Sequence, residues 1–374
     1  MKKVAIIGAS GYSGEELVRL LLSHPYAELC ALTSRQYSGQ TVAQVFPRFA
    51  HHPRAKTARF SEPNAELVAK QAEVVFLALP HGVAAEYAVA LLRLGCRVID
   101  LSADFRLKSA ALYKEFYSHD HPAPALLKSS VYGLPEIYRS QIKDASLIAS
   151  PGCYPTSILL PVIPLLRGGL IRPTGIIADS LSGVSGAGRK VELDYLFVEC
   201  NESVRPYAVP KHRHLSEVEQ ELALAANTPV TIQFTPHLIP VNRGILTTLY
   251  VAPAVHFARG IEPGAPTVAS GAAVPPATSP EAVVTLESLA QKIADCYESA
   301  YGNEPFVRLL QGQALPDTKN VAGTNVIEIA WRLDPRTGRL ILMSATDNIV
   351  KGASGQAVQS FNIMCGFPET AGLL

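Results

Sequence analysis

The stretch KKVAIIGASGYSGEELVRLLL, residues 2–22, decides the fold. A β-rich run at residues 4–7 predicts a strand, and the apolar spacing of residues 14–22 predicts a helix. Between them lies a glycine turn, residues 8–14, with the spacing G-x-x-G-x-x-G. A turn in this place leaves the first N–H groups of the helix free for a pyrophosphate, so it favours dinucleotide binding over the alternative of a purely structural turn.

The first 150 residues continue as alternating strands and helices. Helical spacing recurs at residues 83–94. Strands that are buried on both faces form continuous apolar runs, which are typical of a parallel sheet covered by helices. Such runs occur at residues 28–32, 74–79, 97–101 and 146–149. This part of the chain therefore predicts a doubly wound, Rossmann-like α/β domain.

A different pattern follows the first domain. Runs with alternating or β-branched character lie at residues 176–180, 231–235, 247–251, 326–332 and 340–345. Because few helices separate them, they predict an α+β domain with a mixed, largely antiparallel sheet. Residues 348–364 return to helical spacing, and we expect them to pack back on the first domain.

The predicted division is a cofactor-binding domain of residues 1–152 with 346–374 and a catalytic and oligomerisation domain of residues 153–345. The stretch at residues 259–280 is rich in Gly, Ala, Pro, Ser and Thr. We expect it to form a long surface loop without a chemical role.

Composition and charge exclude several classes of function. The 374 residues carry 33 basic and 32 acidic side chains, and no basic run interleaves with aromatic residues, so we expect no nucleic-acid partner. No apolar run reaches the length of a membrane span. The six cysteines are scattered without a Cys-x-x-Cys pair, which argues against a metal site and against a disulfide framework and fits a reducing cytoplasm.

The end of the second predicted strand favours NADP over NAD. NAD-binding folds usually place a carboxylate here for the ribose 2′-hydroxyl, and a carboxylate would repel a 2′-phosphate. This chain has Thr33, Ser34 and Arg35 instead, which offer two hydroxyls and a cation. Pro80 follows the strand at residues 74–79, at the sheet edge where such folds bind ligands. A solvated Arg35 is the alternative interpretation.

Cys153 is placed unlike the other cysteines. It lies in SPGCYPT, residues 150–156, between a predicted strand and a predicted helix. With Pro155 at the first helical position, Cys153 lies at the helix N-terminus, where the dipole and free N–H groups favour a thiolate and can hold an oxyanion. Pro161 and Pro164 indicate a short or kinked helix. We therefore predict a catalytic nucleophile, with a buried core thiol as the alternative.

A cysteine nucleophile needs a base, and His214 is the best candidate. Ser216 and Glu219 form a predicted capping box, so we expect a helix over residues 216–224. His214 then lies in the loop just before this helix, and Glu217 in the first turn is expected to orient the imidazole or tune its pKa. A basic surface loop is the alternative.

Sequence blocks spread along the chain also match a known family. They are GASGYSGEEL (8–17), DLSADFR (100–106), VYGLPE (131–136), SPGCYPT (150–156), SGVSGAGR (182–189), HRH (212–214), TPHLIPVNRG (235–244) and TDNIVKG (346–352). With them the chain resembles the N-acetyl-gamma-glutamyl-phosphate reductases of arginine biosynthesis, within the semialdehyde dehydrogenase group. The blocks GCYPT and HRH indicate the glutamyl rather than the aspartyl branch.

The resemblance implies NADPH-dependent reduction of N-acetyl-L-glutamyl 5-phosphate to the 5-semialdehyde, through a thioester on Cys153 and with His214 as the acid–base group. A cytoplasmic homo-oligomer is expected. The predicted NADP contacts, including those argued above, are Gly8, Ser10, Gly11, Tyr12, Ser13, Gly14, Ser34, Arg35, Pro80, Ser182, Gly183, Asn348, Lys351 and Gly352. The candidate cations for the anionic substrate are Arg106, Arg189, Lys190, Arg213 and Arg243.

Two alternatives stay open at this point. An enzyme with the same mechanism could act on another acyl phosphate, such as aspartyl phosphate or a carrier-bound aminoadipyl phosphate. A catalytically silent NADP-binding regulatory protein is the alternative from another class. The presence of both Cys153 and His214 beside predicted helix starts argues against the silent protein.

Overall fold

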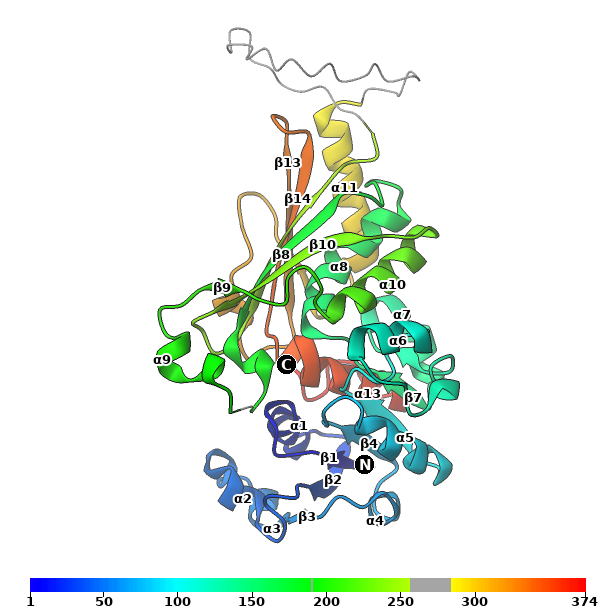
Figure 1. Ribbon diagram of the computed structural model, residues 1–374, viewed down its shortest axis with the longest axis vertical. Coiled ribbons are helices and arrows are strands. Elements are labelled where there is room, and N and C mark those ends of the chain that lie inside the picture. The colour runs from blue at the N-terminus through cyan, green and yellow to red at the C-terminus, as the bar shows by residue number, and fades with distance from the viewer. Residues whose placement is uncertain (190, 256–283) are drawn as a thin grey trace.

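The structure is a computed structural model that describes residues 1–189, 191–255 and 284–374 (Figure 1). The described parts form two seven-stranded sheets, one toward each end of the molecule, and each sheet carries helices. The loop predicted at residues 259–280 lies outside the described residues. None of the helices in the described ranges has the length and apolar character that crossing a membrane requires.

The first sheet is parallel throughout, with the strand order β3-β2-β1-β4-β5-β7-β6. Its strands are β1 (Lys2–Ile7), β2 (Ala27–Thr33), β3 (Phe60–Ser61), β4 (Val74–Leu77), β5 (Arg97–Asp100), β6 (Val131–Tyr132) and β7 (Leu147–Ala149). The helices between them are α1 (Tyr12–Leu22), α2 (Val42–Val45), α3 (Pro53–Thr57), α4 (Ala65–Ala69), α5 (Ala84–Arg93), α6 (Ala110–Tyr117) and α7 (Pro135–Asp144).

Apolar side chains cover this sheet on both faces, because successive side chains of a strand point to opposite sides. In β1, Ile6 packs in one cluster with Leu17 of α1, whereas Ile7 packs in another with Leu91 of α5. The first cluster also contains Phe361 of the C-terminal helix α13 (Gly355–Cys365). The doubly wound fold is confirmed, and the C-terminal helix returns to the first sheet as expected.

The second sheet is mixed and mostly antiparallel, as predicted. Its order is β12-β13-β14-β11-β8-β10-β9, with parallel pairing only for β8–β10 and β12–β13 within the described chain. Its strands are β8 (Ile176–Gly183), β9 (Arg205–Pro206), β10 (Ile232–Ile239), β11 (Ile245–Val251), β12 (Val307–Leu309), β13 (Ile327–Asp334) and β14 (Arg339–Thr346). The remaining helices are α8 (Cys153–Arg167), α9 (Phe197–Cys200), α10 (His214–Ala226), α11 (Leu286–Tyr301), α12 (Thr318–Val321) and a π-helical turn (Val350–Ser354) before α13.

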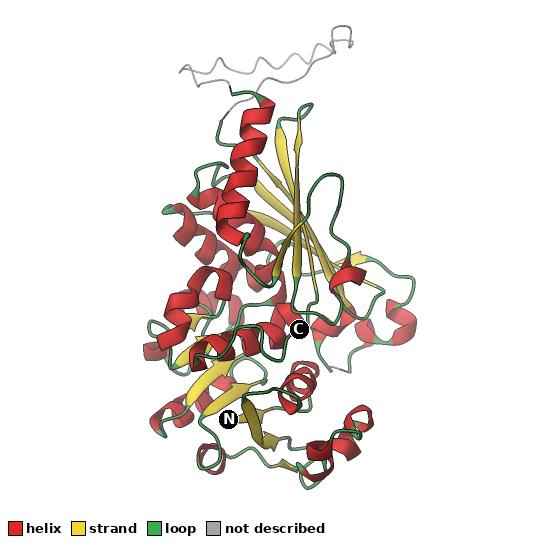
Figure 2. Ribbon diagram, turned by 180° about the vertical axis from the view of Figure 1, so that it is seen from behind, coloured by secondary structure: helices red, strands yellow, loops and turns green. Residues whose placement is uncertain are grey.

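In the described ranges, the long helices of the second half of the molecule lie on one face of the second sheet. Figures 1 and 2 show α8, α10 and α11 on the same side of it. On this side lies a core that joins α8 to the inward residues of β8, β11 and β14. Residues of β8, β10 and β11 alternate between buried and at least partly exposed, so within the described residues the opposite face of the sheet is partly exposed.

Two helices begin at other residues than the sequence patterns indicated. Helix α10 starts at His214 rather than at Ser216, because the backbone of the residue before His214 is already helical. The Ser216 hydroxyl donates to the carbonyl three residues earlier instead of capping the helix. Helix α8 starts at Cys153, with Gly152 as its N-cap, so Pro155 is its third residue.

Helix α8 is continuous in spite of Pro161 and Pro164. Each proline lacks the N–H that would bond the carbonyl four residues earlier. The carbonyl of Leu160, freed by Pro164, accepts a hydrogen bond from the Tyr301 hydroxyl at 2.7 Å. The Ser344 hydroxyl donates at 2.7 Å to the carbonyl freed by Pro161. Hydroxyl groups from the surrounding elements therefore replace the missing helical hydrogen bonds. Of the predicted short or kinked helix, the short form is wrong, because α8 runs for 15 residues.

Candidate active site

Cys153 lies where the first sheet passes into the second half of the molecule. Strand β7 ends at Ala149, and the turn of residues 150–152, which we call the nucleophile turn, leads directly into α8. Cys153 and His214 line the same cavity, of about 410 Å³. The structure therefore brings together the predicted nucleophile and the predicted base, which are 61 residues apart in the chain.

The thiol of Cys153 is not a preformed thiolate, contrary to the prediction. Burial raises its pKa above the ordinary value of a cysteine, although the backbone N–H of Tyr154 and the guanidinium groups of Arg106 and Arg213 oppose this shift. Burial disfavours the charged form, and here it outweighs the helix N-terminus. The thiol is therefore protonated in the chain without substrate and needs a base.

His214 has the properties of such a base. Burial lowers its pKa well below the ordinary value, and the nearby His212, Arg106 and Arg213 lower it further. Its imidazole is therefore neutral near pH 7 and can accept a proton. The backbone N–H of His214 donates to Nδ1 of His212 at 3.1 Å. Its own Nδ1 is buried and has no hydrogen-bond partner among the described residues.

Glu217 does not hydrogen-bond to His214 in the described structure. One turn of α10 separates the two residues, and the Glu217 carboxylate accepts hydrogen bonds from the Tyr132 hydroxyl and the Gly152 N–H. It also forms an ion pair with Arg106 at 3.2 Å. The carboxylate therefore acts on the nucleophile turn, and the prediction that it orients the imidazole does not match its contacts.

The candidate arginines separate into two groups. Arg106 is buried beside the nucleophile turn, and the exposed Arg213 lines the cavity with Cys153. Arg189 instead pairs with Glu15 of α1 at 2.7 Å. Arg243 pairs with the buried Glu16 of α1 at 2.8 Å, and Lys190 lies outside the described residues. Only Arg106 and Arg213 of these cations are brought to Cys153 in the described parts.

The glycine turn has the shape that a dinucleotide pyrophosphate needs. Gly8 has a φ of +87°, and a Cβ on it would lie 2.4 Å from the carbonyl oxygen of Ala78. A Cβ on Gly14 would lie 2.4 Å from the carbonyl oxygen of Gly8. Helix α1 starts at Tyr12 without a side-chain cap at Gly11, so its first N–H groups have no partner from a capping side chain. These residues fit the predicted cofactor.

Two serines connect the glycine turn to the second strand. The hydroxyls of Ser10 and Ser34 lie 2.9 Å apart, and the neighbouring Arg35 is exposed at the end of β2. The Ser13 carbonyl accepts from the Ser354 hydroxyl at 2.9 Å, which ties the start of α1 to the C-terminal segment. The polar edge predicted for a 2′-phosphate is thus present, with Arg35 as its cation.

The other predicted cofactor residues lie at three different places. Ser182 and Gly183, at the end of β8, line the Cys153 cavity, and Pro80 is exposed after β4. Asn348 is buried and bridges the Gly244 N–H and the Ser185 hydroxyl. A second cavity, of about 440 Å³, lies between the start of α1 and the loop after β8. It therefore connects the glycine turn with the segment that follows Ser182 and Gly183.

Lys351 and Gly352 serve packing in the described structure. Lys351 is 0% exposed, and its ammonium pairs with Glu136 at 2.6 Å. It is therefore not positioned to contact a cofactor with its side chain. A Cβ on Gly352 would lie 2.8 Å from Cβ of Cys153, so only glycine allows this segment to pack against the nucleophile.

Comparisons with known proteins agree with this arrangement. The model for "Semialdehyde dehydrogenase, NAD binding domain" matches residues 3–145, and that for "Semialdehyde dehydrogenase, dimerisation domain" matches residues 153–260 and 278–348. The chain belongs to the semialdehyde dehydrogenase family. Within this family it is 54% identical, over 372 residues, to the N-acetyl-gamma-glutamyl-phosphate reductase of Akkermansia muciniphila, with coverage of 99% of this chain and 98% of the relative.

One further relative agrees in sequence, and two solved structures agree in fold. The N-acetyl-gamma-glutamyl-phosphate reductase of Desulfotalea psychrophila is 47% identical over 375 residues, covering 100% of this chain and 98% of that protein. Aspartate semialdehyde dehydrogenase II of Vibrio cholerae, solved in complex with ASA, has a TM-score of 0.67 at 18% identity, covering 98% of each chain. Aspartate semialdehyde dehydrogenase of Candida albicans, solved with NADP, has a TM-score of 0.67 at 15% identity, covering 98% of this chain and 99% of that one. These structures share the fold.

Several residues of this family member's cavity were missed by the sequence analysis. Lys211 and His212 come shortly before the predicted base and line the cavity, and their place in the stretch KHRH, residues 211–214, was the available signal. Arg205 and Tyr207 also line it. They reach it because β9 pairs with β10, a contact that no local pattern indicates. Tyr132 does not line the cavity but donates to Glu217, and it had no signal beyond its matched block.

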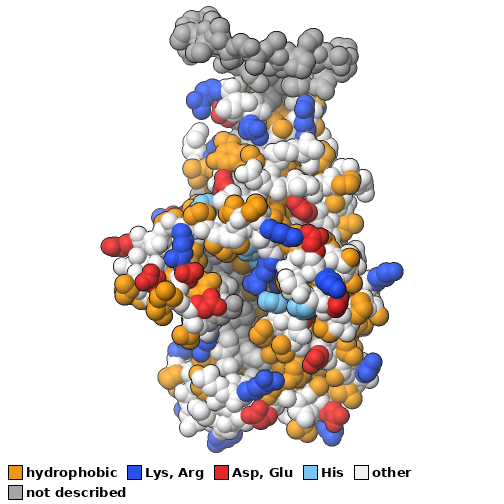
Figure 3. Space-filling view, in the orientation of Figure 1, with side chains coloured by type: hydrophobic (Ala, Val, Ile, Leu, Met, Phe, Trp, Pro, Cys, Tyr) orange, Lys and Arg blue, Asp and Glu red, His pale blue; other side chains and the backbone are white. Residues whose placement is uncertain are grey.

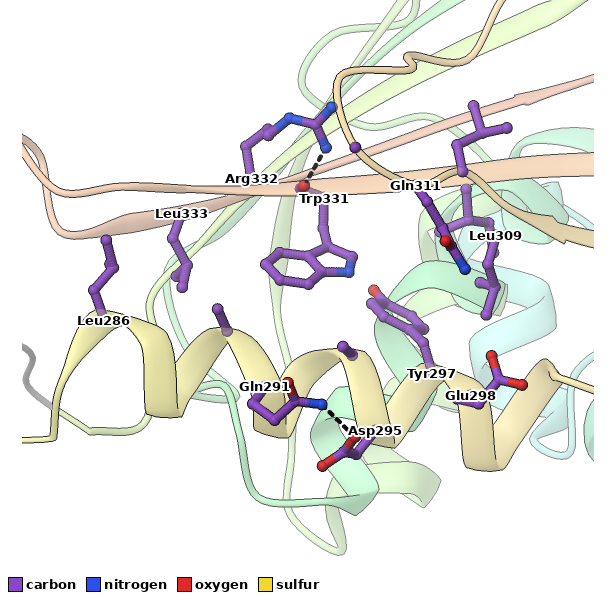
Figure 4. A pocket seen from close by; sticks show the side chains of 15 residues that line it. Leu286, Gln291, Asp295, Tyr297, Glu298, Leu309, Gln311, Trp331, Arg332 and Leu333 are labelled. Atoms are coloured by element: carbon purple, nitrogen blue, oxygen red, sulfur yellow. Dashed lines mark hydrogen bonds between the residues drawn. The ribbon is translucent and has the colours of Figure 1, made fainter.

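A larger cavity, of about 590 Å³, lies away from this site (Figure 4). It is formed between α11 and the strands β12 and β13, with Trp331, Leu309 and Tyr297 facing it. It shares no lining residue with the Cys153 cavity. In the described ranges no group of three or more His, Cys, Asp or Glu side chains could hold a metal ion.

Proposed function

We propose that the chain is an N-acetyl-gamma-glutamyl-phosphate reductase, which uses NADPH to convert N-acetyl-L-glutamyl 5-phosphate to N-acetyl-L-glutamate 5-semialdehyde and phosphate in arginine biosynthesis. The observation that carries the reaction type is that Cys153 and His214 line one cavity. Burial raises the pKa of the thiol and lowers the pKa of the imidazole, so the pair suits a thiol nucleophile with a neutral base. The substrate follows from the relatives that carry this name.

The first chemical step uses this pair of side chains. His214 takes the thiol proton, and the sulfur of Cys153 attacks the carbonyl carbon of the acyl phosphate. The C–S bond forms, the C–O bond to phosphate breaks, and a thioester remains. The N–H groups in the first turn of α8 favour the negative charge that develops on the carbonyl oxygen. Arg106 and Arg213 favour the transient thiolate, because both lower the pKa of Cys153.

NADPH, when bound, supplies the hydride that reduces the thioester. The residues that fit it are the glycine turn of residues 8–14, Ser34 and Arg35 at the polar edge, and Ser182 and Gly183 beside Cys153. The proton that His214 took from the thiol passes to the oxygen of the reduced thioester, which gives a thiohemiacetal on Cys153 and leaves the imidazole neutral again. His214 then removes this hydroxyl proton, the C–S bond breaks and the aldehyde leaves, and the proton returns to the sulfur of Cys153.

Cations around the cavity suit an anionic substrate. Arg205, Lys211 and Arg213 line it, and Arg106 lies beside it. The carboxylate of Asp194 also lines it and lies 3.9 Å from Arg205. Positive charges therefore predominate where the phosphate and carboxylate of the substrate would bind.

The test is phosphate-dependent reduction of NADP⁺ with N-acetyl-L-glutamate 5-semialdehyde. We expect reduction with this aldehyde and phosphate together and none when phosphate is left out. Aspartate semialdehyde is assayed in parallel as the alternative substrate. A higher kcat/KM with aspartate semialdehyde contradicts the proposed substrate, and no reduction with either aldehyde contradicts the proposed reaction.

The division into residues 1–152 with 346–374 and residues 153–345 is part of the proposal. The return of α13 to the first sheet and the start of α8 at Cys153 support it.

The chain is further proposed to work in the cytoplasm as a homo-oligomer. Two features support self-association: the partly exposed face of the second sheet and the apolar surface of α9. In α9, Phe197 and Val198 are 79% and 83% exposed. Phe197→Ser is expected to lower the sedimenting mass, with the exposed Leu67→Ser on α4 as control.

A further inference from the structure

The carboxylate of Glu217 is a meeting point for three different segments. Its Oε1 accepts from the Tyr132 hydroxyl at 2.6 Å and from the Gly152 N–H at 2.8 Å. Its Oε2 accepts from Nη1 of Arg106 at 3.2 Å. Only 1% of Glu217 is exposed, so these groups take the place of water around the charge. The carboxylate thereby fixes the backbone immediately before Cys153.

Arg106 holds the same turn from its other end. Its Nε donates to the carbonyl of Ser150 at 2.7 Å, and its Nη2 donates to the carbonyl of Leu101 at 3.1 Å. Two hydrogen bonds therefore fix the nucleophile turn: Arg106 donates to the Ser150 carbonyl, and the Gly152 N–H donates to Glu217. The ion pair between the two side chains balances their buried charges.

Helix α10 carries both Glu217, which holds the nucleophile turn, and the base His214. His214 and Glu217 are three residues apart on one helix, so they lie on the same face and move together. A Cβ on Gly152 would lie 2.6 Å from Nε2 of His214, so the turn rests directly against the imidazole. The hydrogen bond from Gly152 to Glu217 therefore sets how the thiol of Cys153 faces His214.

We propose that Tyr132 is a positioning residue for the reaction: its hydroxyl holds Glu217 on the Gly152 N–H and so sets Cys153 against His214. Burial and Glu217 raise the pKa of Tyr132, so its hydroxyl stays protonated and donates. Nη1 of Arg106 attracts the same carboxylate from its other oxygen, at 3.2 Å. Without the Tyr132 hydroxyl, the carboxylate turns toward Arg106 and releases the turn.

The neighbouring Tyr138 provides a matched control. Its hydroxyl donates to Glu221, which lies one turn farther along α10. The rings of Tyr132 and Tyr138 lie 6.0 Å apart. Tyr138→Phe therefore removes the same group from the same neighbourhood and the same helix, but it leaves the nucleophile turn untouched.

The experiment compares Tyr132→Phe with Tyr138→Phe by steady-state kinetics and by iodoacetamide labelling of Cys153 as a function of pH. We expect Tyr132→Phe to lower kcat about 10- to 100-fold without a change in KM for NADPH, because a small displacement of reacting groups has this cost. The labelling curve should move to higher pH, because the Tyr154 N–H that lowers the pKa of Cys153 is no longer held at the sulfur. Tyr138→Phe should match the wild type in both measurements.

The kinetic arm rests on the proposed function, whereas the labelling arm needs neither substrate nor cofactor. Equal loss of kcat in the two variants overturns the proposal, since it then reports only a lost buried hydrogen bond. A normal labelling curve in folded Tyr132→Phe also overturns it. If thermal unfolding shows that Tyr132→Phe is unfolded, Glu217→Asp replaces it. This variant keeps the charge but shortens the reach to Gly152, and it must show the same shift in labelling.

Discussion

Two turns of this molecule join a strand to a helix N-terminus, and they are built in opposite ways. The glycine turn between β1 and α1 is determined by its own backbone: Gly8 has a φ of +87°, and a side chain there would meet a backbone carbonyl at 2.4 Å. The nucleophile turn between β7 and α8 has ordinary backbone angles at Gly152, with a φ of −68°. Distant side chains hold it instead, namely Arg106 and Glu217.

The difference teaches where each turn can be broken. A turn with local requirements fails when its own residues change, whereas a turn held by tertiary contacts also fails when a partner far along the chain changes. In addition, the glycine turn is partly exposed, whereas residues 150–152 of the nucleophile turn are buried. Burial also sets the protonation of Cys153 and His214. The following variants break or sharpen this contrast, from the largest expected effect to the smallest.

Cys153→Ser should remove the chemistry of the buried turn and leave the glycine turn intact. We expect turnover to fall by about 10³-fold or more, because a serine hydroxyl does not replace the thiol as nucleophile. Binding of NADPH, followed by its fluorescence, should persist. Cys296→Ser in α11 is the matched control. Near-normal reduction by Cys153→Ser would rule out the covalent route.

His214→Asn should lower kcat by about 10²- to 10³-fold, because a polar side chain remains but no proton acceptor does. Burial lowers the pKa of His214, so in the wild type the imidazole is already neutral at pH 7 and rates should not fall until the pH is well below its ordinary titration range. The variant should depend on hydroxide and rise steadily with pH. An unchanged pH–rate curve would remove His214 from the acid–base role.

The pair Gly152→Ala and Gly8→Ala compares the two turns directly. Gly152→Ala places a Cβ 2.6 Å from Nε2 of His214, so we expect kcat to fall about 100-fold while the Kd for NADPH stays unchanged. Gly8→Ala should show the reverse pattern, with weaker NADPH binding and a loss of about 1–3 kcal/mol in stability from the positive φ. Kinetics, NADPH titration and thermal unfolding separate the two. The same profile for both variants would contradict the contrast.

His212→Asn should have the smallest effect, on stability in mild acid. Burial lowers the pKa of His212 to about 4, below the value of about 6.5 in the unfolded chain. The unfolded state therefore binds the proton first, so stability is complete above about pH 6.5 and is lost as the pH falls toward 4. Between about pH 7.5 and 5.5 the cost is about 1 kcal/mol, which the variant should not show. Denaturant unfolding at both pH values measures it, and an equal loss in both proteins would contradict the assignment.

Much of the fold was readable from local patterns. Continuous apolar runs located β4 and β5, and alternating character located β8 and β11, because burial on two faces or on one leaves a direct trace in the sequence. The two-residue strands β3, β6 and β9 were missed, since pairing with a neighbour, and not their own composition, makes them strands. The start of α10 was placed two residues late, because Ser216 looked like a cap.

The residues of the candidate site also fall into two groups, those that local patterns indicate and those whose role depends on tertiary contacts. Cys153 and His214 were named in advance, since each lies beside a helix start that sequence patterns indicate. The role of Glu217 was misjudged, and Tyr132 was not considered. Their function depends on three segments meeting at one buried carboxylate. Lys351 shows the opposite case, since a motif suggested a cofactor contact but burial placed its ammonium against Glu136.

The sequence by itself determined the longer strands of both sheets, the glycine turn and the identity of the nucleophile, because backbone freedom, side-chain period and residue chemistry are local properties. Only the tertiary structure decided the protonation of Cys153 and His214 and the way the nucleophile turn is held. Both depend on desolvation and on partners such as Arg106 and Glu217, which lie 47 and 64 residues from Cys153 in the chain. Contacts between residues so far apart in the chain form only when the protein folds.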